Sequence, residues 1–294
     1  MTLIKSIIKR LKNINWIAKF QPNLAMQARD AVVAQKLLLE RYRTGPSSCK
    51  LGFRDVGLGI YSQHDEDGIL LYIFGLIGVV NYKLVEICSG DGVECNAANL
   101  LLNHRWTGLL VDGDSKNVQI AKDFYLSRPE TMHWPPDIVE AWLTVDNVNS
   151  VIQEAGYSGE VDLLSLDVDG VDYWLWKAIT VITPRVVVLE FNHLLGPEVS
   201  LSVPYHADFI AEFTEYGSDY AGASIRAFIK LGRSKGYRFV GTNAIATNAF
   251  FVSDAIPTEL LPEANPVDAF KHPRAQFGMK ERYPKVKDKD WVEV

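Results

Sequence analysis

The sequence predicts an α/β fold, a doubly wound and mostly parallel seven-stranded sheet with an antiparallel terminal strand pair and an N-terminal helical extension. Short apolar runs that end in polar residues alternate with helical patterns across residues 51–255, which is typical of parallel strands joined by helices. The runs at 237–240 and 249–252 favour an antiparallel pair at the end of the sheet. We therefore expect residues 1–50 to form the helical extension, 51–255 the sheet domain, and the proline-bearing residues 256–294 an extended tail.

Composition argues against several classes of protein. With 294 residues, of which 48% are hydrophobic and 22% charged, the chain can bury a sizeable core. The net charge of -6 argues against nucleic acid as a partner. Three cysteines, an odd number without metal-ligand spacing, indicate a reducing compartment such as the cytoplasm. The longest apolar run, 69–80, is too short to span a bilayer, so we expect no transmembrane segment.

The N-terminal extension begins with a cationic amphipathic pattern. Apolar residues recur at helical spacing through residues 3–19, with lysines and an arginine between them. Such a helix fits an anionic membrane surface and would make the protein peripheral at the membrane. The alternative is a helix that packs on its own domain or on a second subunit of a homo-oligomer, because any docked helix needs an apolar stripe. Residues 25–42 predict a second helix, and 44–48 a linker.

The sheet domain is organised around a turn after its first strand. Residues 85–87 indicate a buried strand, and Gly90 and Gly92 follow it before a helix through 99–102. These glycines can take positive φ and let the backbone approach a ligand, while the first amides of the helix carry partial positive charge. The next apolar run ends on Asp112, whose carboxylate suits the two hydroxyls of a ribose. Together these features predict a nucleotide-binding site.

Polar residues also precede the apolar helix predicted over 69–77. Ser62 with Asp65 or Glu66 resembles a helix cap, with acids in the first turn. The functional alternative places Gln63, Glu66 and Asp67 beside the nucleotide turn, because this helix leads directly into the strand that carries Glu86.

A third strand is predicted over 139–145, and Asp146 and Asn147 follow it. Ligands of doubly wound sheets lie outside the carboxyl ends of the strands, so these two side chains are candidates to meet an adenine edge. The alternative is a simple cap for the helix predicted over 148–155.

Oxygen-bearing side chains gather after the fourth and fifth predicted strands, 161–166 and 185–189. They are Asp167, Asp169, Asp172, Glu190 and Asn192. Side chains from adjacent strand ends can converge, and carboxylate and amide oxygens suit Mg²⁺, with Asp169, Glu190 and Asn192 as the candidate ligands. The alternative is that these acids cap helices and pair with Arg or Lys. His193 is a candidate general base because imidazole titrates near neutrality, although a loop histidine is often merely polar.

On these motifs the chain resembles the class I methyltransferases that bind S-adenosylmethionine, through Glu86-x-Cys88-x-Gly90-x-Gly92 followed by Asp112. More narrowly it is similar to the FkbM-like methyltransferases over about residues 60–253. The motifs concerned are Ser62-Gln63 with Glu66-Asp67-Gly68, Leu166-Asp167-Val168-Asp169-Gly170 with Asp172-Tyr173, Leu189-Glu190-Phe191-Asn192, and Gly222-Ala223-Ser224 with Lys235-Gly236-Tyr237. Two residues depart from the pattern: Cys88 replaces the first glycine of the usual turn, and Asp65 stands where glycine is expected.

The resemblance implies a Rossmann-like methyltransferase fold and an O-methyltransferase that acts on a hydroxyl of a sugar, glycan or glycosylated natural product. It implies that S-adenosylmethionine is held by the motif residues, with Mg²⁺ at the carboxylates and Asp167 or His193 as the base. The cofactor-binding set is then Gln63, Glu86, Gly90, Gly92, Asp112, Asp146 and Asn147.

Two other kinds of protein fit the same sheet. One is an NAD-dependent oxidoreductase. The turn argues against this class, because it lacks the usual three-glycine spacing. The other is a catalytically silent binding module attached to a complex through residues 3–19. The many carboxylates at residues 167–172 argue against this module.

Overall fold

A computed structural model describes residues 31–45, 51–215 and 217–294. Residues 47–294 belong to one compact unit. The helical residues 31–44 belong to a separate unit and are described by themselves, and they overlap the helix predicted over 25–42. The predicted amphipathic helix at 3–19 lies outside the described residues. None of the described helices is long and apolar enough to cross a membrane.

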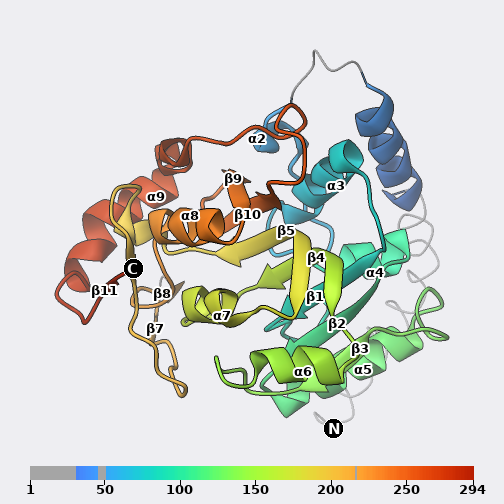
Figure 1. The fold of residues 1–294 in the computed structure, drawn as a ribbon, viewed down its shortest axis with the longest axis horizontal. Coiled ribbons are helices and arrows are strands. Elements are labelled where there is room, and N and C mark those ends of the chain that lie inside the picture. The colour runs from blue at the N-terminus through green and yellow to red at the C-terminus, as the bar shows by residue number, and fades with distance from the viewer. Residues whose placement is uncertain (1–30, 46–50, 216) are drawn as a thin grey trace, which may run out of the picture. The chain divides into compact units, whose positions relative to one another are not determined.

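The centre of the larger unit is a seven-stranded sheet in the order β3-β2-β1-β4-β5-β10-β9 (Figure 1). Its strands are β1 (Lys83–Ile87), β2 (Thr107–Asp112), β3 (Asp137–Glu140), β4 (Gly159–Leu166), β5 (Ile182–Glu190), β9 (Tyr237–Thr242) and β10 (Asn248–Ser253). The first five are mutually parallel, and β10 runs antiparallel to both β5 and β9. The predicted fold class, including the antiparallel terminal pair, is confirmed.

One face of the sheet is covered by three helices that lie side by side, α6 (Val148–Glu154), α7 (Asp172–Ala178) and α8 (Ile225–Ser234) (Figure 1). Side chains alternate between the two faces along each strand, so every second residue of a strand packs against these helices. The rings of Trp176 and Phe228 lie 6.2 Å apart, and Trp176 lies 5.2 Å from Phe251 of β10. The side chain of Ser224 accepts a hydrogen bond from the amide of Ala227 at 3.2 Å and so caps α8.

The opposite face packs against residues from the N-terminal half of the unit. Its helices are α2 (Phe53–Val56), α3 (Glu66–Ile77), α4 (Ala98–His104) and α5 (Ser115–Ser127). Phe53 stacks edge to face on Phe250 with ring centroids 5.4 Å apart, and it also meets Tyr72 of α3. Asp114 caps α5, because its carboxylate accepts from the amide of Lys116 at 2.8 Å. These contacts leave the carboxyl ends of the parallel strands free to form a site.

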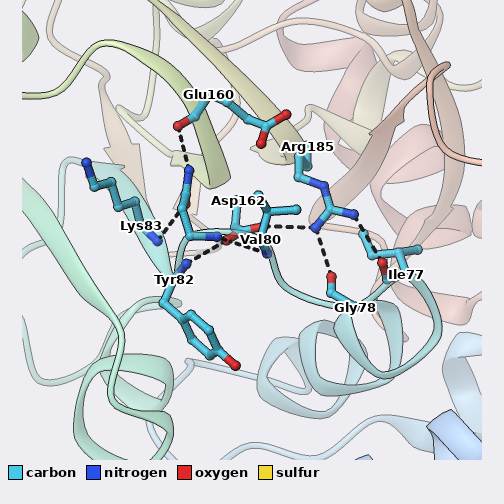
Figure 2. Close-up of polar contacts among 9 residues, drawn as sticks. Ile77, Gly78, Val80, Tyr82, Lys83, Glu160, Asp162 and Arg185 are labelled. Carbon is cyan, nitrogen blue, oxygen red and sulfur yellow. Dashed lines mark hydrogen bonds and ion pairs between the residues drawn. The ribbon is translucent and has the colours of Figure 1, made fainter.

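At the other end of the strands a buried carboxylate ties three segments together (Figure 2). Asp162 of β4 accepts hydrogen bonds from the amides of Val80, Asn81 and Tyr82, just before β1. The guanidinium of Arg185 in β5 donates to the same carboxylate at 2.9 Å. Contacts within the protein therefore fill the side of the sheet that lies opposite the carboxyl ends of the parallel strands.

The C-terminal segment differs from the extended tail that we expected. It forms the short helices η2 (Pro266–Lys271), α9 (Pro273–Phe277), η3 (Gly278–Arg282) and η4 (Tyr283–Lys285) and the strand β11 (Val292–Glu293). β11 pairs antiparallel with β6 (Leu201–Ser202), and η3 packs on the single helical turn η1 (His193–Leu195) that follows β5. The remaining strands β7 (Phe213–Thr214) and β8 (Gly217–Ser218) form a small hairpin. Proline marks the first residues of η2 and α9, where its missing amide costs no helical hydrogen bond.

Candidate active site

The turn after β1 takes the left-handed conformations that its sequence predicts, with φ values of 62° at Cys88, 56° at Gly90 and 68° at Gly92. The amides of Cys88 and Ser89 donate to the carbonyl of Val111, which anchors the turn to the end of β2. Cys88 thus adopts a conformation that favours glycine, at the position where it replaces the glycine of the usual motif. Its side chain is exposed and lies at the edge of a large cavity.

The carboxylate of Glu86 binds the backbone that follows this turn, before α4. Its carboxylate accepts from the amides of Asn96 at 3.0 Å and Ala97 at 2.6 Å, and from the hydroxyl of Ser165 at 3.1 Å. Burial raises the pKa of Glu86, and the two amide hydrogen bonds act against that increase. Glu86 lines the cavity, but its oxygens are largely engaged with the protein's own backbone.

Asp112 joins the turn to the start of α5. One carboxylate oxygen accepts from the amide of Gly90 at 2.9 Å, and the other from the amide of Asp114 at 2.9 Å and the side chain of Asn117 at 3.2 Å. A carboxylate has about four acceptor positions, so room is left for a ligand hydroxyl. Asp112 also lines a small apolar slot of about 80 Å³, beside Trp142 and Leu143.

The two glycines of the turn have different surroundings. A Cβ on Gly90 would meet no atom within 4 Å, and Gly90 lines the cavity. A Cβ on Gly92 would lie 2.9 Å from the Cβ of Ala121, and the Gly92 carbonyl accepts from the hydroxyl of Tyr125 at 2.8 Å. Gly92, which we expected to bind the cofactor, does not line the cavity. Its conformation and close packing give it a structural role.

The cavity lies at the carboxyl ends of β1, β2, β4 and β5 and has a volume of about 930 Å³. This is within the size range of small-molecule sites. Nine of the predicted site residues line it: Gln63, Glu86, Gly90, Asp112, Asp167, Asp169, Glu190, Asn192 and His193. The three predicted residues that do not line it are Gly92, Asp146 and Asn147.

Asp146 and Asn147 are displaced because β3 lies earlier in the chain than predicted. The pairing sets Glu140 opposite Asp112, so Glu140 ends the strand and lines the cavity. Residues 141–144 are then a loop, and Asp146 is exposed in a turn. Asn147 uses its side chain within the loop, where it accepts from the amide of Thr144 at 2.7 Å and donates to the carbonyl of Trp142 at 2.9 Å. Neither residue therefore lines the cavity, although the sequence placed both at its edge.

Three carboxylates meet at the ends of β4 and β5. One oxygen from each of Asp167, Asp169 and Glu190 lies within 4.8 Å of the others. Burial and the neighbouring Asp169 raise the pKa of Asp167 to about 6, and burial with the nearby aspartates raises the pKa of Glu190. Burial also raises the pKa of Asp169, whose backbone takes a φ of 50°. Carboxylates so close together repel one another unless protons or a cation neutralise them.

Asp172, the third acid of this strand end, does a different task. Its carboxylate accepts from the amides of Val168 at 2.8 Å and Gly170 at 3.0 Å, and it is buried. Burial and the neighbouring Asp167 raise the pKa of Asp172 to about 7. It shapes the loop that presents the other two aspartates, and the amides that it binds precede α7, so its side chain does not cap that helix.

Asn192 was expected as a metal ligand, and its side chain is instead committed to the backbone. Its amide nitrogen donates to the carbonyls of Asp219 at 3.0 Å and Ala221 at 2.9 Å, and its oxygen accepts from the amide of Leu194 at 2.9 Å. These bonds fix the chain after β5. Asp167 takes the place in the carboxylate cluster that we had given to Asn192.

His193 lies in η1 under the C-terminal segment and is only 5% exposed. Its Nε2 atom is buried and has no hydrogen-bond partner among the described residues, and a Cβ on Gly278 would lie 2.9 Å from it. Burial and the positive charges of Arg274 and Arg282 lower the pKa of His193 to about 3. An imidazole of such low basicity is a poor proton acceptor near neutral pH, so this arrangement speaks against our expectation of His193 as the base.

Glu66, which the sequence analysis considered beside the nucleotide turn, lines the cavity, whereas Arg274 and Arg282 were missed by the sequence prediction. Glu66 of α3 accepts from the side chains of Asn243 at 2.7 Å and Asn248 at 2.8 Å, which links α3 to β10 at the floor of the cavity. Arg274 and Arg282 come from the segment that we expected to be an extended tail. A helix-capping pattern, His272-Pro273 before Arg274, is the signal that could have placed the first of them in a helix.

No protein-family model matches the sequence, and no curated protein matches it either. Solved structures do match. The methyltransferase domain of bacterial-CtHen1-C is 13% identical, with 64% of this chain and 97% of that one covered and a TM-score of 0.43. Magnesium protoporphyrin IX methyltransferase from Synechocystis PCC 6803 is 10% identical, with 74% and 96% covered and a TM-score of 0.39. A SAM-dependent methyltransferase from Methanosarcina mazei is 10% identical, with 58% and 90% covered and a TM-score of 0.37. Because these similarities are low, we infer the function from this chain's own residues.

Proposed function

We propose that this protein is an S-adenosylmethionine-dependent O-methyltransferase whose acceptor is a hydroxyl of a sugar, glycan or glycosylated natural product. The observation that carries the proposal is the division of one cavity into two parts. The glycine turn and Asp112 form one part, and the cluster of Asp167, Asp169 and Glu190 forms the other. A nucleotide cofactor and a hydroxylated acceptor need such neighbouring regions, because the transferred group must pass directly between them.

The cofactor part fits a nucleoside. Asp112 and Asn117 offer polar atoms for a ribose, and Gly90 lets a ligand come close to the turn. The slot beside Asp112 is lined by Trp142, Leu143 and other apolar side chains, which suits a flat base. We assign the adenine to this slot, in place of the predicted contact with Asp146 and Asn147.

The sheet favours this cofactor over a nicotinamide. Dinucleotide-binding sheets of the doubly wound type continue in parallel after the fifth strand. Here β10 enters antiparallel between β5 and β9, as the resemblance to class I methyltransferases implies. The turn also lacks the three-glycine fingerprint, since Cys88 occupies the first position.

In the acceptor part, Asp167 is the residue that we assign as the base. Sulfonium cofactors supply an electrophilic methyl group, so the protein has to orient the acceptor oxygen and remove its proton. Asp167 lines the cavity and stands at the end of β4, next to β1 and its turn. Asp169 and Glu190 are placed to accept hydrogen bonds from neighbouring hydroxyls of a sugar.

The same three carboxylates fit a divalent cation, and we propose that Asp167, Asp169 and Glu190 hold Mg²⁺. Their oxygens are hard ligands, they converge within 4.8 Å, and their mutual repulsion would be relieved by a positive charge. A bound cation of this kind acts as a Lewis acid that makes a hydroxyl easier to deprotonate. Asp167 can offer one oxygen to the cation and keep the other for a proton.

The narrower similarity to FkbM-like methyltransferases is part of the proposal. It rests on the motif residues at the cavity, among them Gln63, Glu66 and Asp169. The cellular setting also stays a proposal: a cytoplasmic protein with residues 3–19 at a membrane surface or on a partner subunit. Deleting residues 1–20 and measuring binding to anionic liposomes tests this, and unchanged binding would exclude the membrane role.

Calorimetric titration with S-adenosylhomocysteine, and with NADH in parallel, tests the cofactor assignment. We expect the first ligand alone to bind, and its binding to be lost in Asp112→Ala. Asp123→Ala is the matched control, because Asp123 is an exposed acid of α5 outside the cavity. Binding of NADH would favour the oxidoreductase, and no binding of either ligand would favour the silent module.

A second measurement tests the chemistry. Incubation with S-adenosylmethionine and a panel of sugars should give products heavier by one methyl group. Asp167→Asn should abolish product formation and leave the affinity for S-adenosylhomocysteine intact, because Asp167 is assigned to the acceptor part. A product methylated on nitrogen, or full activity of Asp167→Asn, would contradict the assignment.

A further inference from the structure

One wall of the cavity is positively charged. Arg274 of α9 and Arg282 of η3 both line it, and they are the only Lys or Arg side chains among its described lining residues. Both come from the C-terminal segment, which packs on η1 beside the end of β5. The wall therefore faces the acceptor part of the cavity, near Glu190 and His193.

Arg282 is held in place by a buried acid. Its guanidinium donates to the carboxylate of Asp219, and both side chains are 6% exposed. The backbone carbonyl of Asp219 in turn accepts from the side chain of Asn192. Arg282 thus belongs to a fixed frame that connects the C-terminal segment to the chain after β5.

Arg274 is different. It is half-buried, and the ion pairs found among the described residues do not include it. Its backbone is fixed, because its amide donates to the side chain of His272 at 3.2 Å at the start of α9. Arg274 therefore lines the cavity from a fixed point of the backbone, and its guanidinium forms no ion pair with a carboxylate among the described residues.

The charges around Arg274 indicate that this side chain would be stabilised by an anion. Burial and the positive charge of Arg282 lower the pKa of Arg274, while Glu190 acts in the opposite direction. The two arginines together also contribute to the low pKa of His193. Two guanidinium groups that repel each other at a cavity wall are stabilised by an anion between or beside them, and the planar fork of arginine matches carboxylate and phosphate oxygens.

We propose that the acceptor carries an anionic group, a carboxylate or a phosphate, and that Arg274 binds this group while Arg282 adds to the positive charge of the wall. The inference rests on the proposed function and narrows its substrate class to acidic sugars or sugar phosphates. It also gives the C-terminal segment a role in recognition of the acceptor. The hydroxyl to be methylated then lies on the side of the acceptor that faces Asp167.

The test uses the full-length protein saturated with S-adenosylhomocysteine. Glucuronate, glucose 6-phosphate and glucose are titrated as probes, so that a carboxylate, a phosphate and a neutral sugar are compared. We expect one of the two anionic probes to bind at least about tenfold more tightly than glucose, as for a charge-assisted hydrogen bond, and to weaken with added salt. The preferred anionic probe identifies the acidic group.

Three variants locate the effect. Arg274→Gln should remove most of the preference for the anionic probe, and Arg274→Lys should keep part of it, because lysine retains the charge without the fork. Arg226→Gln is the control and should leave the preference unchanged, since Arg226 is exposed, pairs with Glu198 and does not line this cavity. All three should bind S-adenosylhomocysteine as the wild type does, which shows that they are folded.

Each other outcome overturns one statement. Equal binding of glucose and both anionic probes, or an anion preference that persists in Arg274→Gln, would overturn the anionic-acceptor proposal while the cofactor result stands. Failure of S-adenosylhomocysteine to bind the wild type would overturn the proposed function. The anionic probes are then titrated without it, and binding that Arg274→Gln does not weaken would overturn the role of Arg274 as well.

Discussion

The Arg185 guanidinium donates to the Asp162 carboxylate over 2.9 Å, at the end of β4 and β5 that lies away from the cavity (Figure 2). Asp162 is fully buried and also accepts from three backbone amides that precede β1. Arg185 in turn donates to the carbonyls of Ile77 and Gly78 at the end of α3. The pair therefore connects α3, β1, β4 and β5 without taking part in the site.

Asp162→Ala should destabilise the protein by about 3–5 kcal/mol, because it leaves a partly buried guanidinium and three amides without their acceptor. Urea unfolding measures the loss, and the affinity of the folded protein for S-adenosylhomocysteine should not change. Arg185→Met should cost less, since Asp162 keeps its amide donors. An equal or larger loss in Arg185→Met would show that the ion pair, and not the amide cage, is the main contribution.

The two glycines of the turn give a matched pair of substitutions. Gly92→Ala should be strongly destabilising, because φ is 68° and the new Cβ would lie 2.9 Å from the Cβ of Ala121. Gly90→Ala should cost only about 1 kcal/mol, since φ is 56° but the space is open. Its methyl group would instead face the cavity and weaken cofactor binding. Thermal unfolding and calorimetry separate the two effects, and similar stabilities for both variants would contradict the structural role of Gly92.

Cys88 tests whether the departure from the usual turn matters. Its backbone φ of 62° favours glycine, so Cys88→Gly should keep the stability close to that of the wild type and keep or raise the affinity for S-adenosylhomocysteine. Cys88→Leu should lower this affinity, because the side chain lies at the edge of both the cavity and the apolar slot. A loss of affinity in Cys88→Gly would mean that the thiol itself contacts the ligand.

The thiol of Cys88 should also be slow to react, although it is exposed. The protein atoms packed around the sulfur remove water from it, and this desolvation and the negative charge of Asp112 raise the pKa of Cys88. Only the thiolate is a good nucleophile. Iodoacetamide labelling followed by peptide mass spectrometry measures the rate. Asp112→Asn should label faster than the wild type, and an unchanged rate would show that the carboxylate does not control the thiol.

The positions of Asp112 and the carboxylate cluster followed from the sequence because a parallel sheet brings its carboxyl ends to one edge. Apolar runs ending at Leu110–Asp112 and Leu166–Asp167 were enough to predict this. Asp146 does not line the cavity as expected, because the pairing of β3 with β2 fixes the register through Asp137–Glu140, and the apolar pattern at 139–145 does not reveal that pairing. Short strands are set by their neighbours more than by their own residues.

Arg274 and Arg282 show a second limit. They lie in short helices without a continuous apolar stripe, so the sequence between the prolines resembles an extended tail. Their place at the cavity depends on long-range contacts, such as that of Arg282 with Asp219. Likewise the commitment of the Asn192 side chain to two carbonyls and an amide depends on the loop at 219–221, which no local pattern predicts.

The contribution of Asp172 to the stability of the protein should fall as the pH rises from about 4 to about 7 in the absence of divalent cations, while His193, whose pKa is lowered to about 3, contributes in the opposite direction. Burial and Asp167 raise the pKa of Asp172 from 3.8 to about 7, so over this interval the folded state holds a proton that the unfolded state has released. Below the lower pKa both states are protonated and the effect vanishes. Above the higher pKa its full cost, on the order of a few kcal/mol, is reached.

Asp172→Asn tests this assignment, because asparagine does not titrate. Urea unfolding in EDTA should show that the stability of the variant, relative to that of the wild type, rises between about pH 5 and about pH 8. The variant keeps a dependence on pH, since burial also raises the pKa values of Asp167 and Glu190 and lowers that of His193. An identical dependence on pH in both proteins would mean that Asp172 stays ionised in the fold.

Mg²⁺ should stabilise the protein against unfolding, because Asp167, Asp169 and Glu190 converge within 4.8 Å and repel one another when ionised. At a concentration about one hundred times the dissociation constant the gain is about 2.7 kcal/mol. Thermal unfolding at matched ionic strength measures it. Asp169→Asn and Glu190→Gln should lose the gain, whereas Glu94→Gln should keep it, since Glu94 is an acid that lines the same cavity outside the cluster. If Mg²⁺ does not stabilise the wild type, or if the stabilisation persists in Glu190→Gln, the three carboxylates do not hold the cation. Their roles would then be hydrogen bonding and proton transfer.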